Sequence, residues 1–424
     1  MIKSSIWKNI IFVIVDNFFI LFVSLILSIY SYRILGPAKM GVLNTALGFW
    51  GLFGFILAIA NDSIIIRFLT KYKRVNYSIV TLSFIVKFIF GCFSVVVTNI
   101  IASYYTDNNT LLYCIFFASL SGLCNCLTVF DYYFQSISEA NIGSKCRMKA
   151  KLLSAILHIY LLITTTNIYL YSLVLVFYNF MVGIFYFFYY IKIDGMIKYE
   201  NTKNKKFITI LIKRSLPLLL SAIAIPIFMQ SDTVMINYFL GEDEAGLYSA
   251  VTKLLMPLNM IPIAIMTVYF PILIRSKSRN IIFIRLHSIF IYIGVIVACC
   301  VSMFSSEIMV IIYGQEYSSV SNILSIQIWS LVVALIGPIG TKWLIIHGVQ
   351  KVEFYKTIIA ALFNVIGNCL LIPTYGLLGA SISSLLAYLI ANVLIFICIK
   401  KTRQLSKIQY KSLNIISVLN LGKV

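Results

Sequence analysis

Long apolar runs separated by short polar breaks make up most of the chain. A hydrocarbon layer about 30 Å thick is crossed by roughly 20 residues in a helix. Because every backbone amide inside lipid must be bonded internally, continuous apolar runs predict helices, whereas a closed barrel would show alternating residues. We therefore predict an all-α, polytopic membrane protein of about twelve transmembrane helices, with spans at 10–32, 41–66, 79–104, 111–134, 152–166, 169–191, 215–240, 246–274, 286–313, 321–346, 354–372 and 377–399.

An internal repeat suggests that these helices form two halves. The hairpin LGPAKMGVLNTA begins at Leu35, and LGEDEAGLYSA begins at Leu240, so glycines five residues apart recur where two spans join. Glycine tolerates the positive φ of such a turn. We predict two pseudo-symmetric six-helix lobes, residues 1–205 and 206–424, the second ending in a basic cytoplasmic tail. In transporters built from two halves, the substrate binds in the cleft between them.

The charges indicate membrane topology rather than nucleic-acid binding. The formal net charge is +20, but most of the 34 lysines and arginines are distributed among alternate connections and the two chain ends instead of forming one basic face. Short cytoplasmic loops carry such an excess, so we expect both termini in the cytoplasm. The nine cysteines show no metal-ligand spacing, and no GxxxxGK[ST] phosphate loop is present. The sequence therefore predicts no metal site and no nucleotide-driven step, and we name no catalytic residues.

Charged residues inside the predicted spans are the candidates for function, because a charge at the bilayer centre costs roughly 2.5 to 3.5 kcal/mol on insertion scales. Asp232 and Lys253 flank the second glycine hairpin at similar depth, about 10–12 Å below the outer surface. We expect adjacent helices to bring them together. They would form either a substrate-binding cation controlled by an acid or a structural ion pair.

The first half has a smaller set of such charges. Asp16 and Lys87 lie about 9–12 Å from the cytoplasmic side and are expected to be the inner counterpart of the first pair. Asp62 and Asp131 lie near predicted cytoplasmic ends, where a carboxylate reaches interfacial water. Arg33 lies at the outer mouth, where it either extends to lipid phosphate or faces an anionic substrate.

Three stretches together resemble the polysaccharide-unit (Wzx-type) flippases of the MATE/MOP superfamily, which also includes multidrug and toxin extruders and lipid II flippases. They are QSDTVMINYFLGEDEAGLYSAVTKL from Gln230, YRILGPAKMG from Tyr32 and NCLLIPTYGLLGASISS from Asn368. The resemblance covers essentially the whole chain. It implies a protein of the bacterial inner (cytoplasmic) membrane that moves a polyprenyl-diphosphate-linked oligosaccharide from the cytoplasmic to the outer leaflet, by alternating access, for O-antigen (lipopolysaccharide) or capsular polysaccharide assembly.

The resemblance also implies roles for the embedded charges. Lys87, Lys253 and Arg33 match the cations that would bind the diphosphate. Asp16, Asp232 and Asp62 are the candidate coupling or ion-pair carboxylates. No cofactor is implied, although coupling to H⁺ or Na⁺ and to the membrane potential is left open. The expected partners are the lipid-linked oligosaccharide, membrane lipids and other polysaccharide assembly proteins, and no nucleic acid.

Two other functions are weighed against this one. A MATE-like cation or drug antiporter would have an acidic cleft, whereas two embedded lysines favour an anion. A membrane polysaccharide polymerase or glycosyltransferase would need a large external loop or clustered carboxylates, and the sequence shows neither. The chain is therefore expected to be a transporter rather than an enzyme.

Overall fold

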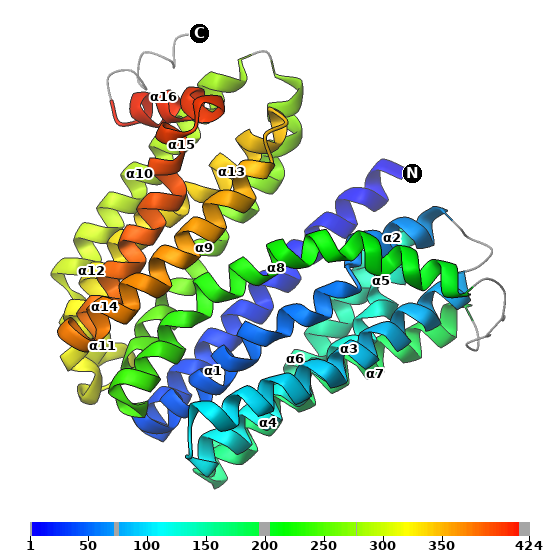
Figure 1. Ribbon diagram of the computed structural model, residues 1–424, viewed down its shortest axis with the longest axis horizontal. Coiled ribbons are helices and arrows are strands. Elements are labelled where there is room, and N and C mark those ends of the chain that lie inside the picture. Colours follow the sequence, from blue (N-terminus) through cyan, green and yellow to red (C-terminus); the bar gives the residue numbers. More distant parts are fainter. Residues whose placement is uncertain (1, 72–75, 195–203, 277, 415–424) are drawn as a thin grey trace. The chain divides into compact units, whose positions relative to one another are not determined.

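The computed structural model describes residues 2–71, 76–194, 204–276 and 278–414, and in these ranges it contains helices and no strands (Figure 1). The chain divides into two compact units, Met1–Pro226 and Ile227–Val424. The division falls within one helix, α8, which spans Asn204–Leu240. The lobe boundary predicted from the sequence, after residue 205, lies in the first turn of that helix. Residues 195–203, part of the connection predicted between the spans at 169–191 and 215–240, lie outside the described residues.

The first unit is a bundle of long helices with short elements at one end. The long helices α1, α4, α6 and α7 pack side by side, and α3 packs on α4, while the short helices α2 and α5 contact each other (Figure 1). The elements are α1 (Ile2–Phe53), the 3₁₀ segment η1 (Gly54–Ile59), α2 (Asp62–Lys71), α3 (Asn76–Tyr105), α4 (Asn109–Cys124), the 3₁₀ segment η3 (Asn125–Thr128), α5 (Val129–Ser136), α6 (Ala140–Thr164), α7 (Ile168–Asp194) and the first part of α8.

The second unit is also a helix bundle. Helix α12 packs against α9, α10 and α14, and the terminal helix α16 packs on α10 and α15. After α8 the elements are α9 (Glu242–Arg275), α10 (Arg279–Met303), α11 (Ser305–Tyr313), η4 (Gln315–Val320), α12 (Ser321–Leu335), α13 (Gly337–Ile346), α14 (Lys351–Leu389), the π-helical turn η5 (Ile390–Leu394), α15 (Ile395–Cys398), η6 (Lys400–Thr402) and α16 (Arg403–Ser412).

Glycines form the two predicted hairpin turns. Gly36 has φ 76° and ψ 174° where the chain turns within α1, and Gly241 has φ 96° and ψ −177° between α8 and α9. Both conformations lie in a region that is essentially restricted to glycine. The prediction of positive φ is confirmed for the first glycine of each pair, whereas the second glycines, Gly41 and Gly246, lie inside α1 and α9. A third glycine, Gly376 (φ 58°), interrupts α14 in the same way.

The helices confirm an all-α, multi-pass membrane protein. Nine stretches of the described residues are long and apolar enough to cross a membrane. Two of these stretches, Phe12–Lys71 and Lys351–Cys398, are 60 and 48 residues long, and Gly36 and Gly376 divide them. Helix α6 is not among the nine, and four bases occupy its first half. With these divisions and α6, the structure is compatible with the predicted twelve spans.

Candidate functional site

Arg147 is the centre of a charged cluster in the first unit. Arg147 lies on α6. Its Nη2 atom lies 2.6 Å from Oδ2 of Asp16 on α1, and its Nε donates to the same oxygen at 2.7 Å. Its Nη1 atom lies 3.3 Å from Oδ2 of Asp131 on α5 and donates to the hydroxyl of Tyr186 on α7 at 3.1 Å. One guanidinium therefore connects four helices and faces two carboxylates.

The cluster leaves two carboxylate oxygens unsatisfied. Oδ1 of Asp16 and Oδ1 of Asp131 are buried without a hydrogen-bond partner in the described part of the chain. A Cβ atom at Gly143 would overlap Oδ1 of Asp131, so glycine at this position lets α5 and α6 approach. With both acids ionised the cluster carries one excess negative charge. Buried acceptors without partners are costly, so the site would stabilise an added proton or small cation.

The predicted counterpart pair between Asp16 and Lys87 is not formed, because the carboxylate of Asp16 is ion-paired with Arg147 instead. The apolar pattern predicts a span that begins at residue 152, which leaves Arg147 in a cytoplasmic loop. Helix α6 begins at Ala140, twelve residues earlier, and so places Arg147 inside the bundle. The available signal was that two acids in predicted spans of the first half, Asp16 and Asp131, share a single embedded base, Lys87.

Lys87 is held by neutral groups. Its Nζ donates to the Thr128 hydroxyl at 3.0 Å and to the Tyr132 hydroxyl at 2.7 Å, and it lies 4.5 Å from the centre of the Tyr132 ring. The residue is 6% exposed. Its position on α3 keeps a buried cation inside the first unit, bonded to neutral oxygens.

Asp232 on α8 lies at the centre of a polar cluster in the second unit. Oδ2 accepts hydrogen bonds from the Tyr248 hydroxyl at 2.9 Å and the Ser384 hydroxyl at 2.5 Å, while Oδ1 accepts from Nδ2 of Asn368 at 2.6 Å. Oδ1 of Asn368 is buried without a partner among the described residues. Asn368 and Ser384 lie on either side of Gly376, so the interruption of α14 brings both arms of this helix to Asp232.

Lys253 on α9 does not pair with Asp232. The described residues record neither an ion pair nor a hydrogen bond for its ammonium group, and the side chain is partly buried. Lys253 lies eleven residues after Glu242, the first residue of α9, and is therefore about 16 Å along the helix axis from its start. Three neutral donors occupy the carboxylate of Asp232, so the predicted ion pair is replaced by a hydrogen-bonded acid and a separate cation.

The two remaining predicted residues are exposed. Arg33 lies on α1, three residues before the turn at Gly36. Asp62 is the first residue of α2, and its Oδ1 accepts from the backbone N–H of Ser63 at 2.7 Å. A carboxylate at a helix N-terminus stabilises the unpaired amides there. The structure thus gives Asp62 a local role in starting a helix.

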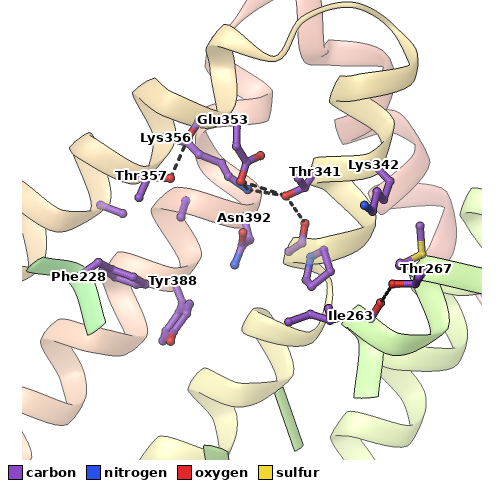
Figure 2. Close-up of a pocket in the computed structure, with 15 residues that line it drawn as sticks. Phe228, Ile263, Thr267, Thr341, Lys342, Glu353, Lys356, Thr357, Tyr388 and Asn392 are labelled. Atoms are coloured by element: carbon purple, nitrogen blue, oxygen red, sulfur yellow. Dashed lines mark hydrogen bonds and ion pairs between the residues drawn. The ribbon is translucent and has the colours of Figure 1, made fainter. Parts of the chain in front are cut away.

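A cavity of about 370 Å³ lies within the second unit, bordered by α8, α9, α13, α14 and η5. Figure 2 shows Lys356 and Glu353 of α14 directed toward Thr341 of α13, with Lys342 further along the same wall. Nζ of Lys356 lies 3.1 Å from Oε1 of Glu353, and the Thr341 hydroxyl donates to Oε1 at 3.0 Å. Nζ of Lys342 lies 4.8 Å from the centre of the Phe270 ring.

The sequence pattern does not predict this cavity either. Lys342 and Lys356 fall at the cytoplasmic ends of the predicted spans 321–346 and 354–372, where basic residues are expected to face the cytoplasm, whereas in the structure Lys356 is 5% exposed inside the unit. Helix α14 begins at Lys351, so its first turns carry charged residues into the bundle before the apolar run starts. The spacing of Glu353 and Lys356, three residues apart on one helix face, was the available signal.

Comparisons with known proteins agree on a family and a fold. Residues 6–277 match the family described as "Polysaccharide biosynthesis protein". The "Probable lipid II flippase MurJ" of Helicobacter pylori (strain ATCC 700392 / 26695) is 26% identical over 209 residues, 46% of this chain and 45% of that protein. The "Capsular polysaccharide biosynthesis protein CapF" of Staphylococcus aureus is 25% identical over 166 residues, 38% of this chain and 42% of that protein.

Solved structures show the same helical arrangement. An inward-facing multidrug resistance MATE family transporter of the MOP superfamily superposes with a TM-score of 0.68 at 16% identity, covering 92% of this chain and 95% of its own. Lipid II flippase MurJ in an inward closed conformation gives 0.65 at 16% identity, with 98% and 93% covered. At this identity the likeness establishes the fold. The matched regions span less than half the length of the curated relatives.

Proposed function

Because this chain belongs to the polysaccharide biosynthesis protein family, we propose that it is a flippase for a polyprenyl-diphosphate-linked oligosaccharide. It moves this lipid from the cytoplasmic to the outer leaflet of a bacterial inner membrane by alternating access, with both chain ends in the cytoplasm. The glycan goes to O-antigen or capsular polysaccharide. Support comes from the family, from the names of the flippase and capsule relatives, and from a fold shared with transporters.

The observation that carries the proposal is the state of Lys253. Its ammonium group lies in a membrane-spanning helix and has no bonded partner among the described residues, unlike Arg147, Lys87 and Lys356. A cation in this position costs roughly 2.5 to 3.5 kcal/mol on insertion scales unless it faces water or an anion. A lipid diphosphate would supply that anion. Lys87 and Arg33 remain predicted diphosphate ligands, and Lys253 is the main ligand that we propose.

The membrane potential favours the proposed direction of transport. A diphosphate carries about two negative charges, and an interior-negative potential favours outward movement of each by about 2.3 kcal/mol per 100 mV. This driving force needs no nucleotide hydrolysis. Export of the lipid-linked sugar can therefore draw on the potential directly.

A coupling cation would act through the two acidic clusters. Asp16 has an unsatisfied buried oxygen beside Arg147, and Asp232 lies next to the unpaired carbonyl oxygen of Asn368. Either site offers oxygen ligands to H⁺ or Na⁺. Asp62 is exposed at the start of α2, and we leave it out of this role.

The drug or cation antiporter is the rival for this fold. It requires a free carboxylate for a cationic substrate. In the described part of the second unit, Asp232 is already bonded to three neutral donors, while Lys253 has no anion. This distribution favours an anionic substrate.

Deletion of the gene tests the proposed function. We expect the deletion strain to accumulate lipid-linked oligosaccharide in the cytoplasmic leaflet, where the glycan is shielded from a periplasmic glycosidase. The wild-type gene and Lys401→Gln, which changes an exposed base beyond α15, should restore exposure, whereas Lys253→Gln should not. Unchanged exposure of the glycan in the deletion strain would contradict the proposal.

A further inference from the structure

The cavity of the second unit has a lining that differs from a simple anion site. It presents one carboxylate, two ammonium groups, one amide, several hydroxyls and two aromatic rings, from Glu353, Lys342, Lys356, Asn392, Thr341, Thr357, Thr267, Tyr388 and Phe228. We propose that this cavity binds one sugar ring of the transported oligosaccharide. The inference rests on the proposed function and identifies the part of the substrate that this cavity would recognise. Ligand pockets commonly measure about 300 to 1,000 Å³, so its volume of about 370 Å³ suits a small group.

The hydrogen bonds of the Glu353 carboxylate indicate whether the ligand is a sugar or a phosphate. Lys356 and Thr341 both bond its Oε1 atom, while Oε2 is buried without a hydrogen-bond partner among the described residues. A buried acceptor in this state requires a donor. A sugar hydroxyl supplies one, whereas an ionised diphosphate supplies none and brings negative charge toward a carboxylate. The Glu353 wall therefore favours a hydroxylated ligand.

Asn392 supplies a second polar group of the cavity from an unusual backbone. It lies in the π-helical turn η5, a rare feature that occurs frequently at functional sites. Nε2 of Gln409 on α16 donates to the backbone carbonyl of Asn392 at 2.8 Å and holds this turn. A Cβ atom at Gly337 would lie 3.0 Å from Oδ1 of Asn392, so this glycine leaves space for the amide. Nδ2 of Asn392 donates to the backbone carbonyl of Val333 at 3.3 Å, which holds the amide at the cavity edge. Its second N–H can donate to a hydroxyl group, and its Oδ1 can accept from one.

The remaining walls complete a sugar-binding surface. The rings of Phe228 and Tyr388 lie 4.9 Å apart at 76°, providing an apolar face against which the C–H groups of a sugar can pack. Lys342 is partly buried at the cavity edge, and its recorded contact is with the Phe270 ring. It can donate to a ring hydroxyl or to the carboxylate of a uronic acid. Lys342 would therefore select between neutral and acidic sugars.

Binding of simple glycosides tests this inference. Saturation-transfer difference NMR on the full chain in detergent would be recorded with methyl glycosides of a neutral hexose, an N-acetylhexosamine and a hexuronic acid, with inorganic pyrophosphate as competitor. We expect at least one glycoside to bind and pyrophosphate not to displace it. Glu353→Gln and Asn392→Ala should each weaken that binding by about tenfold or more, as expected when a hydrogen bond with a buried group is lost.

Matched variants separate binding from folding. Glu307→Gln neutralises an exposed glutamate on α11 and should leave glycoside binding unchanged. Because Glu353→Gln leaves Lys356 without its acid, Lys342→Gln is the second test, and it should weaken the uronide selectively. Absence of binding by every glycoside, displacement by pyrophosphate, or full binding by Asn392→Ala and Lys342→Gln would overturn the sugar pocket. None of these results depends on the leaflet assay of the deletion strain, so the sugar pocket and the flippase proposal can fail separately.

Discussion

Arg147 and Asp16 are separated by 131 residues and are joined by an ion pair of 2.6 Å that connects α6 to α1. The Asp16 side chain is fully buried, and that of Arg147 is 25% exposed. Asp131 shares the same guanidinium from α5. The ion pair thus fixes the first helix of the chain against the rest of its unit through buried charge.

Removing Arg147 should be strongly destabilising. Arg147→Met leaves two buried carboxylates without their cation, and breaking a buried pair in this way costs about 3 to 5 kcal/mol. Thermal unfolding in detergent should show a clear decrease in melting temperature. Lys149→Met, which removes an exposed base two residues away on the same helix, is the control and should change it little. An unchanged melting temperature for Arg147→Met would show that the cluster contributes little to stability.

Substitution of Asp232, a proposed coupling acid, and of the exposed Asp62 should have different effects on ion coupling. Asp232→Asn removes the carboxylate at the centre of the polar cluster while keeping its shape, so any dependence of transport on Na⁺ or on a proton gradient should be lost. Asp62→Asn should leave the ion dependence intact, because Asp62 is exposed and bonds only the first turn of α2 among the described residues. Flux measured in vesicles with and without each gradient checks this. Equal ion dependence in wild type and Asp232→Asn would exclude coupling at Asp232.

The glycine turn between α8 and α9 should not accept a side chain. Gly241 adopts φ 96° and ψ −177°, so Gly241→Ala is expected to cost about 1 to 3 kcal/mol through backbone strain, although a Cβ atom there would meet no neighbour. Asp243→Asn, at an exposed site in the next helical turn, should change stability by no more than about 0.5 kcal/mol. Chemical unfolding of both variants provides the comparison. Equal stability of Gly241→Ala and wild type would mean that the turn relaxes to a conformation open to alanine.

Much of the fold was predictable because lipid imposes simple rules on sequence. The apolar runs indicated the helices, and the repeated glycines at Gly36 and Gly241 marked turns whose positive φ is confirmed. The family resemblance, carried by the stretch around Asp232 and the two glycine hairpins, is confirmed by the match over residues 6–277. These features depend on local sequence and on the solvent.

The arrangement of charges was less predictable because it depends on where helices begin. A hydropathy pattern ends a span near its first cluster of charges, so it predicts Arg147 in a loop and Lys356 at the cytoplasmic end of its span. In the structure, α6 and α14 extend past those charges and carry them into the bundle. The pairing of Asp16 with Arg147, and of Asp232 with neutral donors, depends on contacts between helices far apart in the sequence. Helical spacing alone cannot supply these contacts.

Flipping of a labelled lipid by the purified protein is the most direct test of the central claim, that Lys253 is a free cation for a lipid diphosphate. Proteoliposomes would contain a fluorescent polyprenyl-diphosphate-linked oligosaccharide, and a membrane-impermeant quencher would report its leaflet over time. The account predicts rapid exchange with wild type and with Lys401→Gln, and strongly slowed exchange with Lys253→Gln at equal protein content and equal melting temperature. Exchange by Lys253→Gln at the wild-type rate, or no exchange by the wild-type protein, would contradict it.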